Sequence, residues 1–133
     1  MQQLVEHAGR LGRILVVDDE VNLALMLKDG LNKLPNCEVA MATSGEQALQ
    51  LFAEQPFDLL ITDYKMPGID GLALAMRIRR LYPLTAIVMM TAYGNDDLRV
   101  RATRVNIRHF LDKPVQLTDI RLAVLEALSQ PKR

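Results

Sequence analysis

Three acidic side chains, a hydroxyl and an amine each stand where a short apolar run of this sequence ends. They are Asp18, Asp19, Asp63, Thr91 and Lys113. Three carboxylates brought together repel one another, and a divalent cation relieves that repulsion. Because the ligands are all oxygens, we expect Mg²⁺ or Mn²⁺ rather than zinc. An oxygen nucleophile, a metal, a hydroxyl and an ammonium group are the parts that phosphoryl transfer requires.

Each of these features is common by itself. An acidic pair after a strand usually forms a turn or a helix cap, a lone Lys-Pro is a frequent loop dipeptide, and a threonine at a strand end usually has no special role. Chance seldom produces all of them at four strand ends in this order. The sequence therefore favours one shared site.

The elements that must position these residues alternate along the chain. Short β-branched runs are followed by stretches whose apolar residues recur at helical spacing. We expect strands over residues 13–17, 38–42, 57–62, 85–90 and 108–111, each followed by a helix. The second helix begins with a capping box, either Ser44 with Gln47 or Thr43 with Glu46, and Pro35 with Asn36 ends the first. The fourth helix is capped by Asn95, Asp96 or Asp97.

Five strands that each lead into a helix predict an α/β fold with a parallel sheet covered on both faces. Right-handed crossovers leave few topologies, and we expect the flavodoxin-like strand order 2-1-3-4-5, a (βα)5 three-layer sandwich. Ligands of such sheets bind beyond the carboxyl ends of the strands, where the residues named above stand.

Composition limits the class of protein. The chain has 133 residues, half of them apolar and 24% charged, as a single globular domain requires. Its apolar runs are too short to cross a bilayer, Glu6 interrupts any signal peptide, and Cys37 alone can form no internal disulfide. We expect a cytoplasmic protein without membrane contact.

Charge is unevenly divided along the chain. Residues 1–70 carry 5 basic and 11 acidic groups, whereas residues 71–133 carry 11 basic and 5 acidic groups. Such asymmetry can indicate a nucleic-acid surface. However, no aromatic residue is interleaved with the arginines and no helix-turn-helix pattern is present, so we expect no direct nucleic-acid binding.

Four segments carry a family resemblance. Residues 14–20 (ILVVDDE) resemble the opening of receiver domains of two-component response regulators, and residues 58–71 (DLLITDYKMPGIDG) resemble their phosphorylation-site segment. Residues 88–94 (VMMTAYG) and 110–114 (FLDKP) match the remaining two signatures. The likeness extends from about Arg13 to Leu128, and we expect a receiver domain over 13–130, an extension or linker over 1–12 and a tail over 131–133.

The resemblance implies a role for each matching position. Asp63 matches the phosphoacceptor, Asp19 the direct metal ligand, and Asp18 the carboxylate that usually acts through water. Lys65 would offer its backbone carbonyl to the metal. Lys113 matches a residue that binds the phosphoryl oxygens.

A second group of matches concerns the switch. Thr91 also matches a residue that binds a phosphoryl oxygen, and Phe110 matches the aromatic whose inward turn accompanies activation. Ala92 retains the small side chain that is needed beside the phosphoryl group. Two departures occur: Asn106-Ile107 replaces the usual Gly-Ala, and Phe110 replaces a frequent tyrosine. Asparagine tolerates the left-handed conformation, so we expect a helix C-cap at Asn106.

The implied activity is Mg²⁺-dependent transfer of a phosphoryl group from a phosphohistidine to Asp63, by a phosphoacceptor domain rather than a dedicated enzyme. The donor would be a sensor histidine kinase or a phosphotransfer protein. The readout face would comprise the fourth helix, the fifth strand and the fifth helix, near Arg99, Arg101, Arg104 and Arg108. An output domain, a downstream protein or a second copy of the chain would contact that face, and the chain would be either a stand-alone receiver or part of a longer regulator.

Other readings compete with this one. A pseudo-receiver, used as an interaction module without phosphorylation, usually lacks a key residue, and all are present here. An aspartyl-phosphate phosphatase needs a second acid near its nucleophile, where this chain has Lys65. A nucleotide-binding module needs a glycine-rich loop after the first strand, whereas Gly9 and Gly12 precede it.

Overall fold

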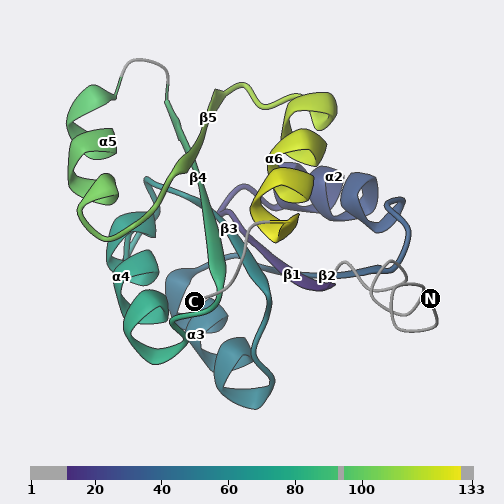
Figure 1. Ribbon diagram of the computed structural model, residues 1–133, viewed down its shortest axis with the longest axis horizontal. Coiled ribbons are helices and arrows are strands. Elements are labelled where there is room, and N and C mark those ends of the chain that lie inside the picture. Colours follow the sequence, from purple (N-terminus) through teal and green to yellow (C-terminus); the bar gives the residue numbers. More distant parts are fainter. Residues whose placement is uncertain (1–11, 93–94, 130–133) are drawn as a thin grey trace.

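The computed structural model describes residues 12–92 and 95–129. Strands and helices alternate throughout this part of the chain (Figure 1). The elements are β1 (Gly12–Val17), α2 (Val21–Asn32), β2 (Cys37–Ala42), α3 (Gly45–Glu54), β3 (Leu59–Asp63), α4 (Gly71–Leu81), β4 (Ala86–Ala92), α5 (Asp96–Thr103), β5 (His109–Lys113) and α6 (Leu117–Ser129).

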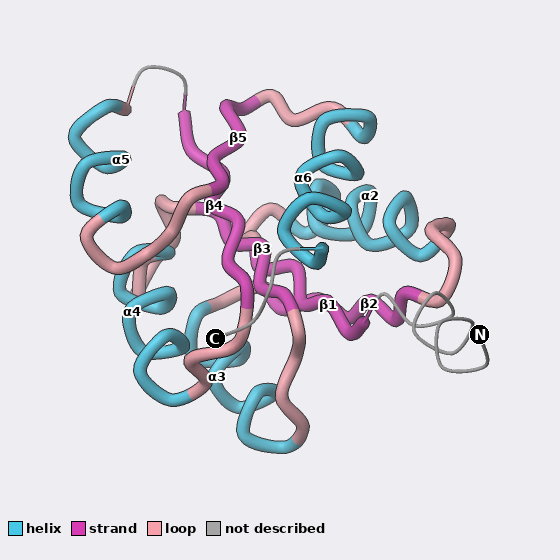
Figure 2. Tube along the Cα trace, viewed as in Figure 1, coloured by secondary structure: helices cyan, strands magenta, loops and turns pink. Residues whose placement is uncertain are grey.

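All strand pairs of the five-stranded sheet are parallel, and the strand order is β2-β1-β3-β4-β5. Figure 2 shows the strands at the centre with the helices outside them. The expected topology is confirmed. Because β1 lies between β2 and β3, and β3 lies between β1 and β4, the carboxyl ends of β1, β3 and β4 are neighbours.

Alternate side chains of the strands enter two separate cores. Leu15 and Val17 of β1 belong to the core shared with α3, α4 and α5, whereas Ile14 and Val16 belong to the core shared with α2 and α6. Helices therefore cover both faces of the sheet, with α3, α4 and α5 on one side and α2 and α6 on the other (Figure 1). This is the expected three-layer sandwich, and burial on both faces explains why the strands read as continuous apolar runs.

Several element boundaries differ from the sequence prediction. β3 begins at Leu59 rather than residue 57. β1 and β2 end where predicted, whereas β3, β4 and β5 extend further at their carboxyl ends, so that Asp63, Thr91 and Lys113 are strand residues. The ladder explains the extension, because Asp63 pairs with Met90 and Ala92 pairs with Lys113. α2 ends at Asn32, earlier than expected, and the Asn32 side chain accepts a hydrogen bond from the Val39 backbone N–H.

The structure identifies the N-cap residues of α3 and α5, for which the sequence had left alternatives open. Ser44 caps α3 and accepts a hydrogen bond from the Gln47 N–H at 3.1 Å. The Gln47 side chain reaches back to the Thr43 N–H, one residue before the cap. Asn95 caps α5 and accepts from the Leu98 N–H.

Asn106 and Ile107, which replace the usual Gly-Ala pair, fit the backbone and the core at this position. Asn106 has φ of 68°, the left-handed conformation expected of it. Ile107 is 1% exposed and packs in the core beneath α5. Among the described residues, no helix is long and apolar enough to span a membrane.

Core packing can be tested with two leucines that both lie in helices. Leu74 of α4 is fully buried, whereas Leu122 of α6 is 62% exposed. Leu74→Ala should lower the free energy of unfolding by about 2–5 kcal/mol, because it removes buried methyl groups and leaves a cavity. Leu122→Ala, the matched control, should change it by less than about 0.5 kcal/mol. Urea unfolding of both variants measures the difference, and equal losses would contradict the layer assignment.

Candidate functional site

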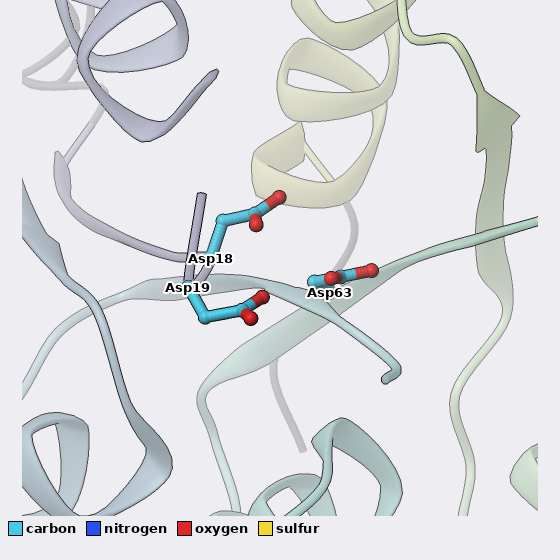
Figure 3. Close-up of side chains that lie close together, drawn as sticks. All are labelled: Asp18, Asp19 and Asp63. Carbon is cyan, nitrogen blue, oxygen red and sulfur yellow. The ribbon is translucent and has the colours of Figure 1, made fainter. Parts of the chain in front are cut away.

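Three carboxylates meet at the carboxyl edge of the sheet. Asp18 and Asp19 directly follow β1, and Asp63 is the last residue of the adjacent β3. Each offers an oxygen atom that lies within 4.8 Å of the others (Figure 3). The strand order thus brings together residues that are 45 positions apart.

The three acids differ in their contact with water. Asp18 is fully buried and Asp63 is 7% exposed, whereas Asp19 is exposed. The Glu20 backbone N–H donates a hydrogen bond to Asp18 Oδ1 at 2.9 Å, which fixes the orientation of the buried carboxylate. A buried charge needs a partner, because desolvation is costly.

Lys113 provides that partner from the end of β5. Its Nζ lies 3.0 Å from Asp18 Oδ2 and 3.2 Å from Asp63 Oδ2, and 3.8 Å from Glu20 Oε1. One ammonium group therefore lies among several carboxylates. The Glu20 contact was not predicted from the sequence, although Glu20 directly follows the acidic pair.

The charges of the cluster act on one another. Burial raises the pKa of Asp63, the negative charge of Asp18 raises it further, and the charge and hydrogen bond of Lys113 only partly offset this. Burial by itself lowers the pKa of Lys113, but the hydrogen bonds and charges of Asp18 and Asp63 outweigh it and raise that pKa. The carboxylates are thus incompletely neutralised by Lys113.

This donor set fits a divalent cation that prefers oxygen. Asp18, Asp19 and Asp63 supply carboxylate oxygens at mutually compatible separations. The pKa of Asp63 is raised first by burial and then by the negative charge of Asp18, and a bound cation would oppose both effects. Lys65 is exposed in the loop that follows Asp63.

Thr91 lies near the end of β4, the strand that pairs with β3. It is 1% exposed, and its hydroxyl has no hydrogen-bond partner among the described residues. A buried hydroxyl without a partner is uncommon and costs free energy. Ala92 follows it at the exposed end of the strand.

Phe110 lies on the neighbouring strand β5, where it pairs with Met89 of β4. Its ring is partly buried, and the Arg99 guanidinium of α5 lies 5.5 Å from the ring centroid. Arg99 also forms an ion pair with Asp112. Phe110 thus connects α5 with the edge strand. It has no hydroxyl group, so its side chain contributes by packing and not by hydrogen bonding.

A hydrogen bond that the sequence did not predict connects α5 with the loop after β3. Arg101 Nη2 donates to the Tyr64 hydroxyl at 2.9 Å, and the same guanidinium pairs with Asp97. No sequence signal identifies this contact, because the two residues are 37 positions apart. This hydrogen bond connects Tyr64, the residue next to Asp63, with α5, the helix that follows β4.

The loop after β3 returns tightly onto the strand. The Gly71 N–H donates to the Tyr64 carbonyl oxygen at 2.7 Å. A Cβ atom at Gly71 would lie 2.0 Å from the Asp63 carbonyl oxygen, so only glycine permits this approach. Asp70 then caps α4 by accepting from the Ala73 N–H.

Comparisons with known proteins agree with this architecture. The family model of the response regulator receiver domain matches residues 14–125. The chain is 33% identical over 115 residues to a probable chemotaxis protein CheY of Rhizobium etli, covering 84% of this chain and 88% of that protein. It is 35% identical over 116 residues to the response regulator protein PilR of Pseudomonas aeruginosa, covering 87% of this chain and 26% of PilR.

Solved structures show the same relationship. A putative response regulator from Chloroflexus aurantiacus superposes with a TM-score of 0.82 at 33% identity, covering 90% of this chain and 98% of that one. The receiver domain of NtrX from Brucella abortus gives a TM-score of 0.82 at 30% identity, covering 89% and 99%.

The fold and the acidic edge of the sheet define a flavodoxin-like signalling module. This chain belongs to the response regulator receiver domain family, and hence to the proteins of two-component signal transduction. It spans about a quarter of the length of PilR and of the regulators ZraR, AtoC and FleR, but most of the length of CheY and of sporulation initiation phosphotransferase F.

The close approach of Gly71 to the backbone of Asp63 and Tyr64 can be tested by adding one methyl group at Gly71. Gly71→Ala should destabilise the fold by more than about 2 kcal/mol, because backbone atoms of Asp63 and Tyr64 must move. Gly30→Ala is the control, since the nearest atoms that its Cβ would meet belong to a side chain, that of Leu117, rather than to the backbone. Thermal unfolding measures both variants. A loss of stability at Gly71 no larger than that at Gly30 would contradict a requirement for glycine at this return.

The raised pKa of Asp63, caused by burial and by the charge of Asp18, predicts a pH-dependent gain in stability for Asp63→Asn in metal-free buffer. A raised pKa means that the folded state disfavours the charged carboxylate, because burial and the charge of Asp18 outweigh Lys113, the one cation that contacts Asp63 among the described residues. The variant should match the wild type at low pH. Its advantage should develop as the pH rises from the ordinary value of 3.8 through the raised pKa, and then stay constant.

The stabilities of the wild type and of Asp63→Asn are compared by thermal unfolding in the presence of a chelator, at a series of acidic pH values. Asp29→Asn, on the exposed carboxyl-terminal part of α2, is the control and should show no such pH-dependent gain. An Asp63→Asn variant that is less stable than the wild type above that range would contradict an unfavourable charge at Asp63 in the folded state.

Proposed function

We propose that Asp63 accepts a phosphoryl group from a phosphohistidine. The observation that carries this proposal is the position of Asp63: its carboxylate lies 3.2 Å from Lys113 Nζ and beside two further carboxylates. The nucleophile and a cation that can bind the transferred group are therefore already in contact. Residues 13–130 would form the functional domain.

The metal would be held by Asp18, Asp19 and Asp63, together with the backbone carbonyl of Lys65. When bound, Mg²⁺ or Mn²⁺ supplies positive charge that neutralises the carboxylates and the oxygens of the transferring group. The oxygen donors gathered here support this assignment.

In the transfer, a carboxylate oxygen of Asp63 attacks the phosphorus atom in line with the bond to the donor histidine. The phosphorus–nitrogen bond breaks, and its electron pair stays on the imidazole nitrogen. Lys113 leaves Asp63 and binds an oxygen of the transferred group, where its charge stabilises the developing negative charge. Asp18 would keep Lys113 close during this exchange, because it holds the same ammonium group at 3.0 Å.

The product carries more negative charge at the same place, and Thr91 can respond to it. Its buried hydroxyl, which has no hydrogen-bond partner in the part of the chain that the structure describes, would donate to a phosphoryl oxygen. The small side chain of Ala92 leaves room beside the phosphoryl group. Movement of Thr91 opens space into which Phe110 turns, so that a local change of charge alters the packing of β5 against α5.

The surface formed by α5, β5 and α6 would then report the phosphorylated state. A movement of Phe110 would alter the contacts of Arg99, because Arg99 contacts both Phe110 and Asp112. Arg101, Arg104 and Arg108 are exposed nearby and would contribute to a partner surface. Partners of this face would be an output domain, a downstream protein or a second copy of the chain.

The phosphodonor would be a sensor histidine kinase or a phosphotransfer protein. The printed names of relatives include a chemotaxis protein, transcriptional regulatory proteins and a sporulation initiation phosphotransferase, which shows that one receiver fold serves different outputs. The domain would assist its own phosphorylation and dephosphorylation rather than act on other substrates.

Phosphorylation can be tested with a small phosphodonor such as acetyl phosphate in the presence of Mg²⁺. Intact-protein mass spectrometry should show one added phosphoryl group, removable by hydroxylamine because it is an acyl phosphate. Asp63→Asn should remain unlabelled, whereas the control Asp29→Asn should be labelled like the wild type. Labelling of Asp63→Asn equal to that of the wild type would refute the assignment. Absence of label on the wild type, with a kinase as well as with the small donor, would favour a pseudo-receiver.

A further inference from the structure

A groove of about 420 Å³ lies at the amino-terminal edge of the sheet, opposite the carboxylates. It is formed by the residues that precede β3 and those that precede β4, mainly Pro56, Phe57, Leu81, Tyr82, Pro83 and Leu84. Neither the candidate site nor its switch uses this groove.

The groove combines a rigid floor with exposed apolar walls. Phe57 and Tyr82 each contact the buried ring of Phe52, with ring centroids 5.1 Å apart. Leu81 is 61% exposed and Leu84 is 51% exposed. Covering adjacent leucines with other apolar side chains is favourable, because it removes apolar surface from water.

The chain enters the sheet beside this groove. Gly12, the first residue of β1, has φ of 136°, and a Cβ atom there would lie 2.7 Å from Asp58 Oδ2. The Arg13 N–H donates to the same oxygen at 2.8 Å, and the Arg13 guanidinium lies 4.3 Å from the centroid of the Phe57 ring. Since Asp58 and Phe57 both line the groove, residue 12 stands directly at its rim.

Residues 1–11 precede this entry point and lie outside the described residues. Their sequence places Leu4, Val5, Ala8 and Leu11 at a spacing that would put them on one face of a helix. The second wall of the groove precedes β4, which is two strand spacings from β1, or roughly 10 Å. Eleven residues span about 16 Å as a helix and at most roughly 40 Å when extended, so the segment can reach it.

We propose that residues 1–11 dock in this groove through their apolar side chains. Leu4 and Leu11 cover Leu81 and Leu84, and the polar residues of the segment face solvent. A segment tethered at Gly12 has a high effective concentration at a groove that Gly12 itself adjoins, which favours it over a separate partner. The amino-terminal edge of the sheet is then covered while the carboxyl edge stays open for the proposed phosphoryl transfer.

A nitroxide probe on the full chain tests this arrangement. The background variant Cys37→Ser removes the native thiol, and Glu6→Cys introduces one on the face of the segment away from its apolar residues. The attached nitroxide should strongly attenuate the methyl resonances of Leu81 and Leu84, relative to the reduced sample. The methyl groups of Leu122 and Leu125, exposed on α6, should retain their intensity.

Two further samples make the result decisive. Leu4→Ser with Leu11→Ser should abolish the attenuation at Leu81 and Leu84, whereas the matched control Gln2→Ser with Gln3→Ser should preserve it. No attenuation in the parent sample would overturn the proposal. It would also be overturned if nitroxide-bearing chains attenuated these signals in separate, isotope-labelled chains, since the occupant would then be a second copy.

Discussion

The ammonium group of Lys113 is the interaction on which the functional edge of this protein depends. It contacts the fully buried Asp18 and the nearly buried Asp63 at once, 3.0 and 3.2 Å from their oxygens. Without it, two carboxylates would share a desolvated space with no compensating charge, an arrangement that costs several kcal/mol. With it, burial and the charge of Asp18 still outweigh the effect of Lys113 on Asp63, which is why the pKa of Asp63 remains raised. Lys113 therefore compensates the buried charges only in part, and the carboxylate oxygens gathered there suit a further cation.

A second constraint follows from the parallel sheet. Each strand must end at the same edge, so residues from β1, β3, β4 and β5 meet there although helices separate them along the chain. The two cores beneath the helices hold that edge in place. At that edge the Thr91 hydroxyl has no hydrogen-bond partner among the described residues, and a side-chain hydrogen bond joins Arg101 of α5 to Tyr64. A rigid sheet with adjustable attachments at one edge suits a switch.

The order of strands and the acidic cluster could be predicted because both follow from local patterns. Apolar runs and capping residues marked the elements, and the rule that parallel strands end together placed Asp18, Asp63, Thr91 and Lys113 at one edge. Boundaries were less accurate: Asp63 and Lys113 are strand residues rather than loop residues, because ladder pairing with neighbouring strands extends the strands. Such pairing depends on partners that are remote in the sequence, so the residues of a single strand do not reveal where it ends.

The chemical groups of the site are legible in the residue order: the carboxylates, the hydroxyl and the lysine, the asparagine that can take a left-handed conformation, and the family to which they point. Which atoms come into contact follows from the packing of the folded chain. The contacts of Lys113 with Glu20, of Arg101 with Tyr64, and of Gly71 with the carbonyl of Asp63 join residues whose types are ordinary for their places in the chain. The same holds for the groove beside Gly12, which arises where two strand starts and a helix end converge. Residue types set the charges and hydrogen bonds that are available, and packing in three dimensions selects the pairs that form.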